Sequence, residues 1–285
     1  MKRGWPNAVL SCVQRSLDSC SRCFMENTLE KTLYLSEHPR LRIRRDGPSI
    51  WVEHAGQAGR RVPARLVRRV LIRGNVALDA GSLMLFADRG VPITLVRRDG
   101  TPSAVIVPFA VTSPRRAMRQ RGILEDRRKR EQFCAWLEAW ERGRQIALVA
   151  RLAPHVVIRW KREGFRREDY DAVLEQHLDQ PVADSGERAF VAGLLFEFVL
   201  SELAAEGWDP QIGIRQLAGP LGFAHDLTEA LAPEVDRVWV ETVARSRAPV
   251  ATSFTLIREF ERARPRLTKL LRSMLRQYER LLWEP

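Results

Sequence analysis

Long apolar runs are missing from this chain of 285 residues. No window reaches the roughly 18 uninterrupted apolar residues that a membrane span needs. The basic start, Met1 to Pro6, also lacks an apolar stretch long enough for the core of a signal peptide. We therefore expect no membrane partner and a cytoplasmic location.

Cysteine is scarce as well, and the chain has only Cys12, Cys20, Cys23 and Cys134. Cys20 and Cys23 form a lone CxxC pair with no second pair at zinc spacing. The cysteines therefore make no disulfide framework, and we expect reduced thiols, as in cytoplasmic proteins.

Lysine is nearly absent, since it supplies five of the 47 basic residues, and the net charge is still +12. A GC-rich genome explains arginine in place of lysine, but it explains the excess of positive charge less well. The planar guanidinium group can bind two phosphate oxygens at once. The composition therefore predicts a nucleic acid partner.

The spacing of apolar residues changes near residue 112. Before it, alternating or β-branched runs between turn residues predict strands at 32–35, 40–44, 49–53, 67–72, 92–96 and 104–107, and one helix at 79–89. After it, helical spacing predicts helices at 115–131, 132–151, 164–178, 186–206, 225–232, 234–247 and 253–283, the last with a candidate break at Pro265.

These elements predict an α+β fold with two domains. A small β-rich domain at 31–112 precedes a larger all-α domain at 113–285, and residues 1–30 form an N-terminal extension. That extension is either a small amphipathic helix or a disordered segment.

A basic run at 114–130 begins the helical domain. Its density of positive charge fits a phosphate-facing surface and a solvated helix face about equally well. The candidate DNA-binding residues in this run are Arg115, Arg116, Arg119, Arg127, Arg128, Lys129 and Arg130.

A Gly/Pro-rich turn from Gly207 to Gln216 leads to two acids, Asp226 and Glu229. Acids three residues apart on a helix share one face, where they can share a cation or a proton. A simpler explanation is that both acids lie in a first helical turn, where the helix dipole favours negative charge.

This segment is similar to the active-site segment of the CRISPR spacer-acquisition integrase (Cas one) family. The family pattern is Gly-Leu-Asp-Pro-x-x-Gly-x-x-His, then Asp-Leu-x-Glu and Pro-x-Val-Asp. The chain has Gly-Trp-Asp-Pro-Gln-Ile-Gly from Gly207, Asp-Leu-Thr-Glu from Asp226, and Pro-Glu-Val-Asp from Pro233. Residues 33–108 also follow the order of the family's first domain.

The resemblance implies a divalent metal, Mg²⁺ or Mn²⁺, held by a Glu from an earlier helix, a His and the first Asp. By position these are Glu163, Gln216 and Asp226, with Glu229 as a second catalytic acid. Glu163 keeps the family's Glu-Gly and a later Tyr, but it fits an exposed acid equally well.

Gln216 stands where the family has histidine. Its amide oxygen is a neutral and weaker ligand, and it cannot carry a proton near neutral pH. His225 should not replace that histidine, because adjacent helical residues point about 100° apart.

The resemblance implies a metal-dependent endonuclease and strand transferase that inserts foreign DNA fragments into a CRISPR array. Its implied partners are double-stranded protospacer and repeat DNA, a second copy bound through the β-rich domain, and the small ferredoxin-like Cas two subunit. A catalytically silent, DNA-binding architectural subunit is the alternative. A third interpretation is that the chain is an unrelated, Arg-rich RNA-binding protein.

Overall fold

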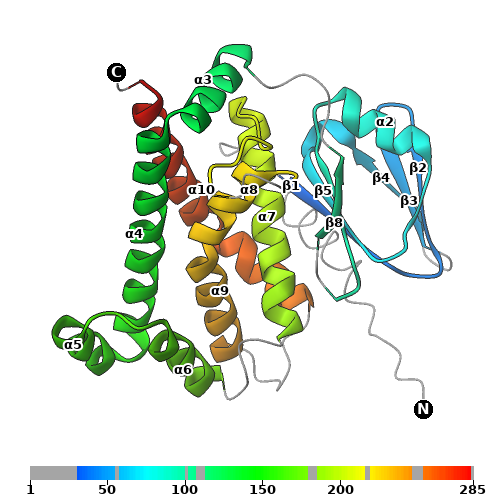
Figure 1. The fold of residues 1–285 in the computed structure, drawn as a ribbon. Helices are drawn as coiled ribbons and strands as arrows, with labels where there is room; N and C mark the ends of the chain where they lie inside the picture. The colour runs from blue at the N-terminus through cyan, green and yellow to red at the C-terminus, as the bar shows by residue number, and fades with distance from the viewer. Residues whose placement is uncertain are drawn as a thin grey trace, which may run out of the picture. The chain divides into compact units, whose positions relative to one another are not determined.

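The structure is a computed structural model, and it describes residues 31–54, 58–99, 102–106, 113–178, 185–215, 219–245 and 253–283 (Figure 1). The first of two compact units contains residues 31–98 and 103–106, and the second contains nearly all described residues from 113 onward. Strands make up the first unit and helices the second, which confirms the α+β, two-domain class. The 1–30 extension lies outside the described residues.

Two four-stranded sheets form the first unit, with strand orders β1-β5-β7-β8 and β4-β3-β2-β6. β1 pairs parallel with β5, as does β5 with β7, whereas β2 and β3 form an antiparallel pair. The strands are β1 (Lys31–Ser36), β2 (Leu41–Asp46), β3 (Ser49–His54), β4 (Arg60–Pro63), β5 (Val67–Arg73), β6 (Ala77–Leu78), β7 (Ile93–Val96) and β8 (Pro102–Ile106).

Every predicted strand is present, but β4 and β6 were not predicted. β4 has two arginines and a proline, and β6 has two residues, so neither carries the alternation that marks a strand. Both are fixed by pairing instead, β4 along β3 and β6 along β2. A short 3-10 turn, Ala64–Leu66, joins β4 to β5.

Helix α2 (Ala80–Asp88) carries the chain from β6 to β7 and confirms the predicted helix. Asp79 caps it by accepting the Ser82 N–H at 2.7 Å, and its other oxygen accepts the Arg45 N–H at 3.0 Å. Hydrogen bonding to Ser82, above all, lowers the pKa of the Asp79 carboxyl, and the Arg45 N–H acts in the same direction. One side chain thus starts the helix and attaches it to β2.

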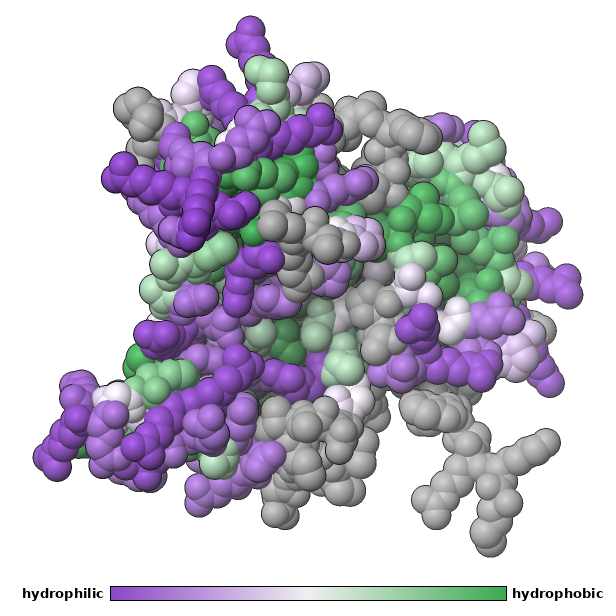
Figure 2. Space-filling view, viewed as in Figure 1, coloured by the Kyte–Doolittle hydropathy of each residue, from purple (hydrophilic) through white to green (hydrophobic). Residues whose placement is uncertain are grey.

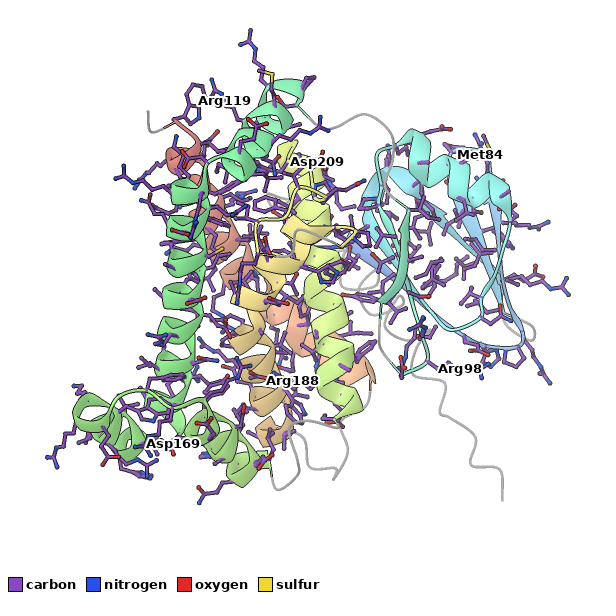
Figure 3. All side chains as sticks on the ribbon, viewed as in Figure 1. Met84, Arg98, Arg119, Asp169, Arg188 and Asp209 are labelled. Carbon is purple, nitrogen blue, oxygen red and sulfur yellow. The ribbon has the colours of Figure 1, made fainter. Side chains whose placement is uncertain are left out.

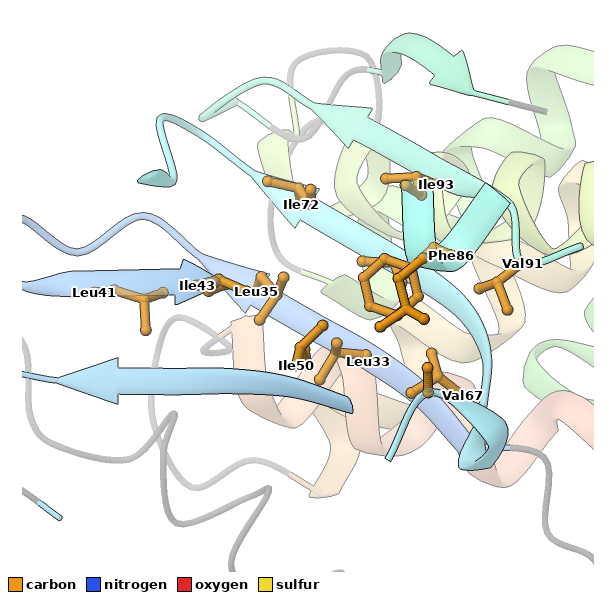
Figure 4. Packing of buried hydrophobic residues seen from close by; sticks show 13 residues of the cluster. Leu33, Leu35, Leu41, Ile43, Ile50, Val67, Ile72, Phe86, Val91 and Ile93 are labelled. Atoms are coloured by element: carbon orange, nitrogen blue, oxygen red, sulfur yellow. The ribbon is translucent and has the colours of Figure 1, made fainter. Parts of the chain in front are cut away.

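The core of this unit lies between the strands and α2 (Figure 4). Leu33 and Leu35 face it from β1, Ile43 and Ile50 from β2 and β3, and Phe86 from α2. Along β2 buried and exposed residues alternate from Leu41 to Arg44, as the sequence predicts.

Eight helices form the described part of the second unit. They are α3 (Pro114–Glu125), α4 (Arg127–Leu152), α5 (Pro154–Glu163), α6 (Arg167–Leu178), α7 (Gly186–Glu206), α8 (Gly222–Ala230), α9 (Ala232–Arg245) and α10 (Ser253–Trp283). α5 was not predicted, and α10 runs through Pro265 without a break. No helix in the described ranges is long and apolar enough to cross a membrane.

α7 has a long run of buried residues and packs against α8 and α9. α4 packs against α8 and α9 as well, and with α5 and α6. A buried carboxylate, Asp236 of α9, accepts the Tyr170 hydroxyl of α6 at 2.8 Å and Arg188 Nε of α7 at 2.6 Å. Arg188 is labelled in Figure 3. These contacts join three helices around one charge.

Candidate functional site

The turn after α7 positions the site. α7 ends at Gly207, whose φ of 73° is the left-handed conformation that glycine adopts easily. The Trp208 N–H then donates to the Leu203 carbonyl at 3.0 Å, and the buried Trp208 ring packs 5.4 Å from the Tyr278 ring. The Gly-Trp pair of the motif therefore closes one helix and anchors the turn in the core.

Asp209 and Pro210 direct the turn toward α8. The Gln120 side chain of α3 exchanges two hydrogen bonds with the Asp209 backbone, at 3.0 and 3.1 Å. The Pro210 carbonyl accepts the Phe223 N–H at 3.0 Å, which fixes the first turn of α8. Asp209 is labelled in Figure 3. The motif thus orients the helix that carries both acids.

α8 begins at Gly222, so Asp226 lies in its second turn. The first-turn explanation for the acid pair is therefore wrong, because the helix starts three residues earlier than the sequence predicts. Asp226 is fully buried, and its Oδ2 accepts the Ile214 N–H at 2.6 Å and the Arg215 N–H at 3.0 Å. Two charge-assisted hydrogen bonds attach the motif loop to α8.

Glu229 follows Asp226 by three residues on α8. Its side chain is 46% exposed, and its Oε2 lies 3.8 Å from Arg215 Nη1. The Arg215 side chain thus extends from the loop over the acids of α8.

Glu141 of α4 adds a third carboxylate to this region. Burial raises the pKa of the Glu141 carboxyl, the charges of Glu229 and Glu138 act in the same direction, and Arg167 and Arg215 oppose them. Arg167 Nη1 lies 3.5 Å from Glu141 Oε1. Arg215 therefore lies near the acids of both α8 and α4.

Cys134 lies about two turns before Glu141 on α4. Burial and the charge of Asp226 raise the pKa of its thiol, while Arg215 opposes them. The thiol is therefore held in its protonated form at neutral pH, as expected of a reduced, unreactive cysteine.

The predicted ligands are not brought together in the described residues. Glu163 is exposed at the end of α5, which lies apart from α8 in Figure 1. Gln216 lies outside the described residues. The His225 ring packs against Phe196 of α7, with ring centroids 4.6 Å apart.

A divalent metal does not fit this arrangement as it stands. Carboxylate oxygens suit Mg²⁺ and Mn²⁺. Yet within the described ranges no three His, Cys, Asp or Glu side chains are placed to hold a metal ion. The cations that lie there are guanidinium groups, that of Arg215 beside Glu229 and that of Arg167 beside Glu141.

Sequence reasoning missed Glu141 and Arg215. The available signal was a pair of polar residues, Glu141 and Gln145, four apart and therefore on one face of a predicted helix. Gln145 is buried and donates toward Glu141 Oε1 at 3.5 Å. Nothing in the sequence placed α4 beside α8, because that contact depends on the tertiary fold.

The predicted DNA-binding residues lie on α3 and the start of α4. Arg115 and Arg128 are exposed, and Figure 2 shows hydrophilic surface over α3. Arg116 lies over the Trp208 ring and donates to the Glu206 carbonyl, so it also holds α3 in place. Arg119 covers the Trp283 ring of α10. A role in DNA binding stays a prediction for this set.

The family model described as CRISPR associated protein Cas1 matches residues 33–154. That range ends before the motif turn and α8. Comparison with curated proteins gives no match.

Solved structures share the fold over most of the chain. A CAS1 protein from Thermotoga maritima has a TM-score of 0.73 and 17% identity, covering 88% of this chain and 96% of its own. A casposase bound to its integration product has a TM-score of 0.64 and 15% identity, covering 81% and 82%. A Cas6-RT-Cas1–Cas2 complex has a TM-score of 0.63 and 10% identity, covering 89% and 36%.

Proposed function

Since this chain is a divergent member of the Cas1 family, we propose that it acts in CRISPR adaptation as a DNA-binding subunit of an integration complex. The observation that carries the architectural role is the place of Arg215, whose guanidinium lies beside Glu229 and acts on Glu141. The motif turn and the acid pair of the family pattern are present, but a guanidinium lies near the acids that would hold a metal.

The proposed ligand is double-stranded DNA, as protospacer and CRISPR repeat. Its support is the net charge of +12 and the exposed arginines of α3 and α4. These residues would bind phosphate and position the duplex, without reading its sequence.

The proposed protein partners are a second copy and the small ferredoxin-like Cas2 subunit. One solved relative is a complex that contains Cas2. Figure 2 shows hydrophobic surface over the strand-rich unit, and the Met84 side chain of α2, labelled in Figure 3, is exposed. We propose this unit as the contact between copies.

Strand transfer is the second candidate function, with Mg²⁺ or Mn²⁺ as its cofactor. Asp226 and Glu229 favour it, because the motif turn holds this acid pair in the family's frame. Glu141 is a better placed early-helix acid than Glu163, since its charge interacts with that of Glu229. Gln216 remains the proposed third ligand by position.

Binding and strand-transfer assays on the full chain separate the two roles. We expect tight binding of branched duplex DNA by fluorescence anisotropy and no joining of a DNA 3′-hydroxyl to a repeat duplex in Mn²⁺. The same assays compare Gln216→His with Glu229→Gln, its matched control. Joining by the unaltered chain that Glu229→Gln abolishes would assign the active role instead, and absence of DNA binding would refute both.

A further inference from the structure

Arg215 places a permanent positive charge in the region where strand transfer, the second candidate function, would require a metal ion. We infer that Arg215 is a resident cation that neutralises Glu229 and Glu141 and keeps a divalent metal from binding to the acids of α8 and α4. The inference rests on the proposed function only in taking these acids as the family's metal-binding region.

The backbone of the loop fixes the point from which the Arg215 side chain extends. Its backbone N–H donates to Asp226 Oδ2 at 3.0 Å, so the side chain starts at the buried acid. Its Nη1 then lies 3.8 Å from Glu229 Oε2. Arg215 is therefore held by two acids of one helix, its backbone by Asp226 and its guanidinium by Glu229.

The contact between Arg215 and Glu229 is electrostatic and is not a hydrogen bond. Arg215 Nη1 is closed to solvent and makes no hydrogen bond, so the surrounding carboxylates compensate for its lost hydration. The Arg215 charge acts on Glu141 and on the Cys134 thiol of α4, each of which also faces an acid of α8. One guanidinium thus balances acids from two helices.

A divalent ion and this guanidinium exclude each other. Arginine stays protonated at every working pH, so its charge cannot be removed to admit the ion. Two cations a few ångströms apart in a partly buried site repel strongly. Without Arg215, only Arg167 would offset the like charges of Glu141 and Glu229, and the oxygen atoms of the two acids would favour a hard cation.

The test is Mn²⁺ binding to the full chain, measured by electron paramagnetic resonance of the free ion. The unaltered protein should bind Mn²⁺ only weakly. Arg215→Met, which keeps the length of the side chain, should bind Mn²⁺ at least ten times more tightly. Adding Glu229→Gln to that variant should remove the gain.

Arg61→Met is the matched control. It also removes one arginine and leaves a carboxylate, Asp46, without its partner at 2.5 Å, but both side chains are well exposed in the strand-rich unit. It should leave Mn²⁺ binding unchanged. Arg215→Gln repeats the test if the methionine variant does not fold by circular dichroism.

Three results would overturn the inference. One is a folded Arg215 variant that binds Mn²⁺ no better than the unaltered chain, and another is an equal gain in Arg61→Met. The third is micromolar Mn²⁺ binding by the unaltered protein that Glu229→Gln abolishes. DNA binding by anisotropy is measured in parallel, so its absence would refute the proposed function and not the metal result.

Discussion

The charge state of Glu141 depends on the candidate site, because Glu229 and Arg215 both act on the pKa of its carboxyl. Burial first, and then the charges of Glu229 and Glu138, raise the pKa of its carboxyl in the folded chain. In the unfolded chain a glutamate has a pKa of about 4.3. The folded state therefore binds this proton more tightly, and ionised Glu141 lowers stability once the pH exceeds that value.

We predict that Glu141→Gln stabilises the protein at pH 7 and that the gain shrinks at pH 4. The sign follows because the glutamine needs no desolvated charge, whereas at pH 4 the glutamate is itself largely protonated. Urea unfolding at both pH values measures the difference. Glu125→Gln, at an exposed position of α3, is the control and should change stability little at either pH. A loss of stability at pH 7 in Glu141→Gln would contradict the prediction.

Helices α6, α7 and α9 depend on one buried carboxylate. Asp236 is 1% exposed and accepts from Arg188 and Tyr170. Burial, followed by the charge of Asp236, raises the pKa of the Tyr170 phenol, so the hydroxyl remains a donor at neutral pH. Arg188 is the cation that balances Asp236 in this contact.

Arg188→Met should lower the free energy of unfolding by about 3–5 kcal/mol, because it leaves a buried charge without its partner. Tyr170→Phe removes one neutral donor, and its cost should be about 1 kcal/mol. Chemical denaturation of the two variants beside the unaltered chain measures both values. Equal costs would show that Arg188 acts only as one more hydrogen-bond donor.

The sequence predicts elements well where caps and periodicity agree. The predicted α7 is correct at both ends, where Ser185 caps its start and Gly207 its end. The break between α3 and α4 lies at Asp126, several residues earlier than predicted. Asp126 accepts the Lys129 N–H at 3.1 Å and so starts α4, a cap hidden within a run of charges.

The site was predictable only in part, because contacts between distant segments assemble the rest of it. The spacing of Asp226 and Glu229 placed them on one helix, and the motif placed the turn before it. Glu141 and Arg215 join them through packing of α4 on α8 and through the backbone of the loop. Such contacts between distant segments leave no local pattern in a single sequence.

At the scale of the whole molecule, the net charge of +12 and the exposed arginines of α3 and α4 predict salt-dependent DNA binding. We expect the logarithm of the binding constant to fall linearly with the logarithm of salt concentration. Neutralising Arg127 and Arg128 together should reduce that slope by about 2, since each phosphate contact contributes about 0.9. Anisotropy titrations at several salt concentrations measure the slopes.

Arg61 and Arg65 of the strand-rich unit provide the matched control, because neutralising them removes the same charge from another surface. Their loss should leave the slope nearly unchanged. Equal slopes in both double variants would mean that the net charge binds DNA without a defined surface on α3 and α4.

The hydrogen bonds from Ile214 and Arg215 to Asp226 bear on how such a chain evolves. An aspartate that anchors a loop is needed for folding even in a copy that performs no chemistry. Mutational drift in such a chain would therefore spare Asp226 whether or not catalysis is kept. Retention of this aspartate is thus a poor criterion for sorting active from inactive members of the family.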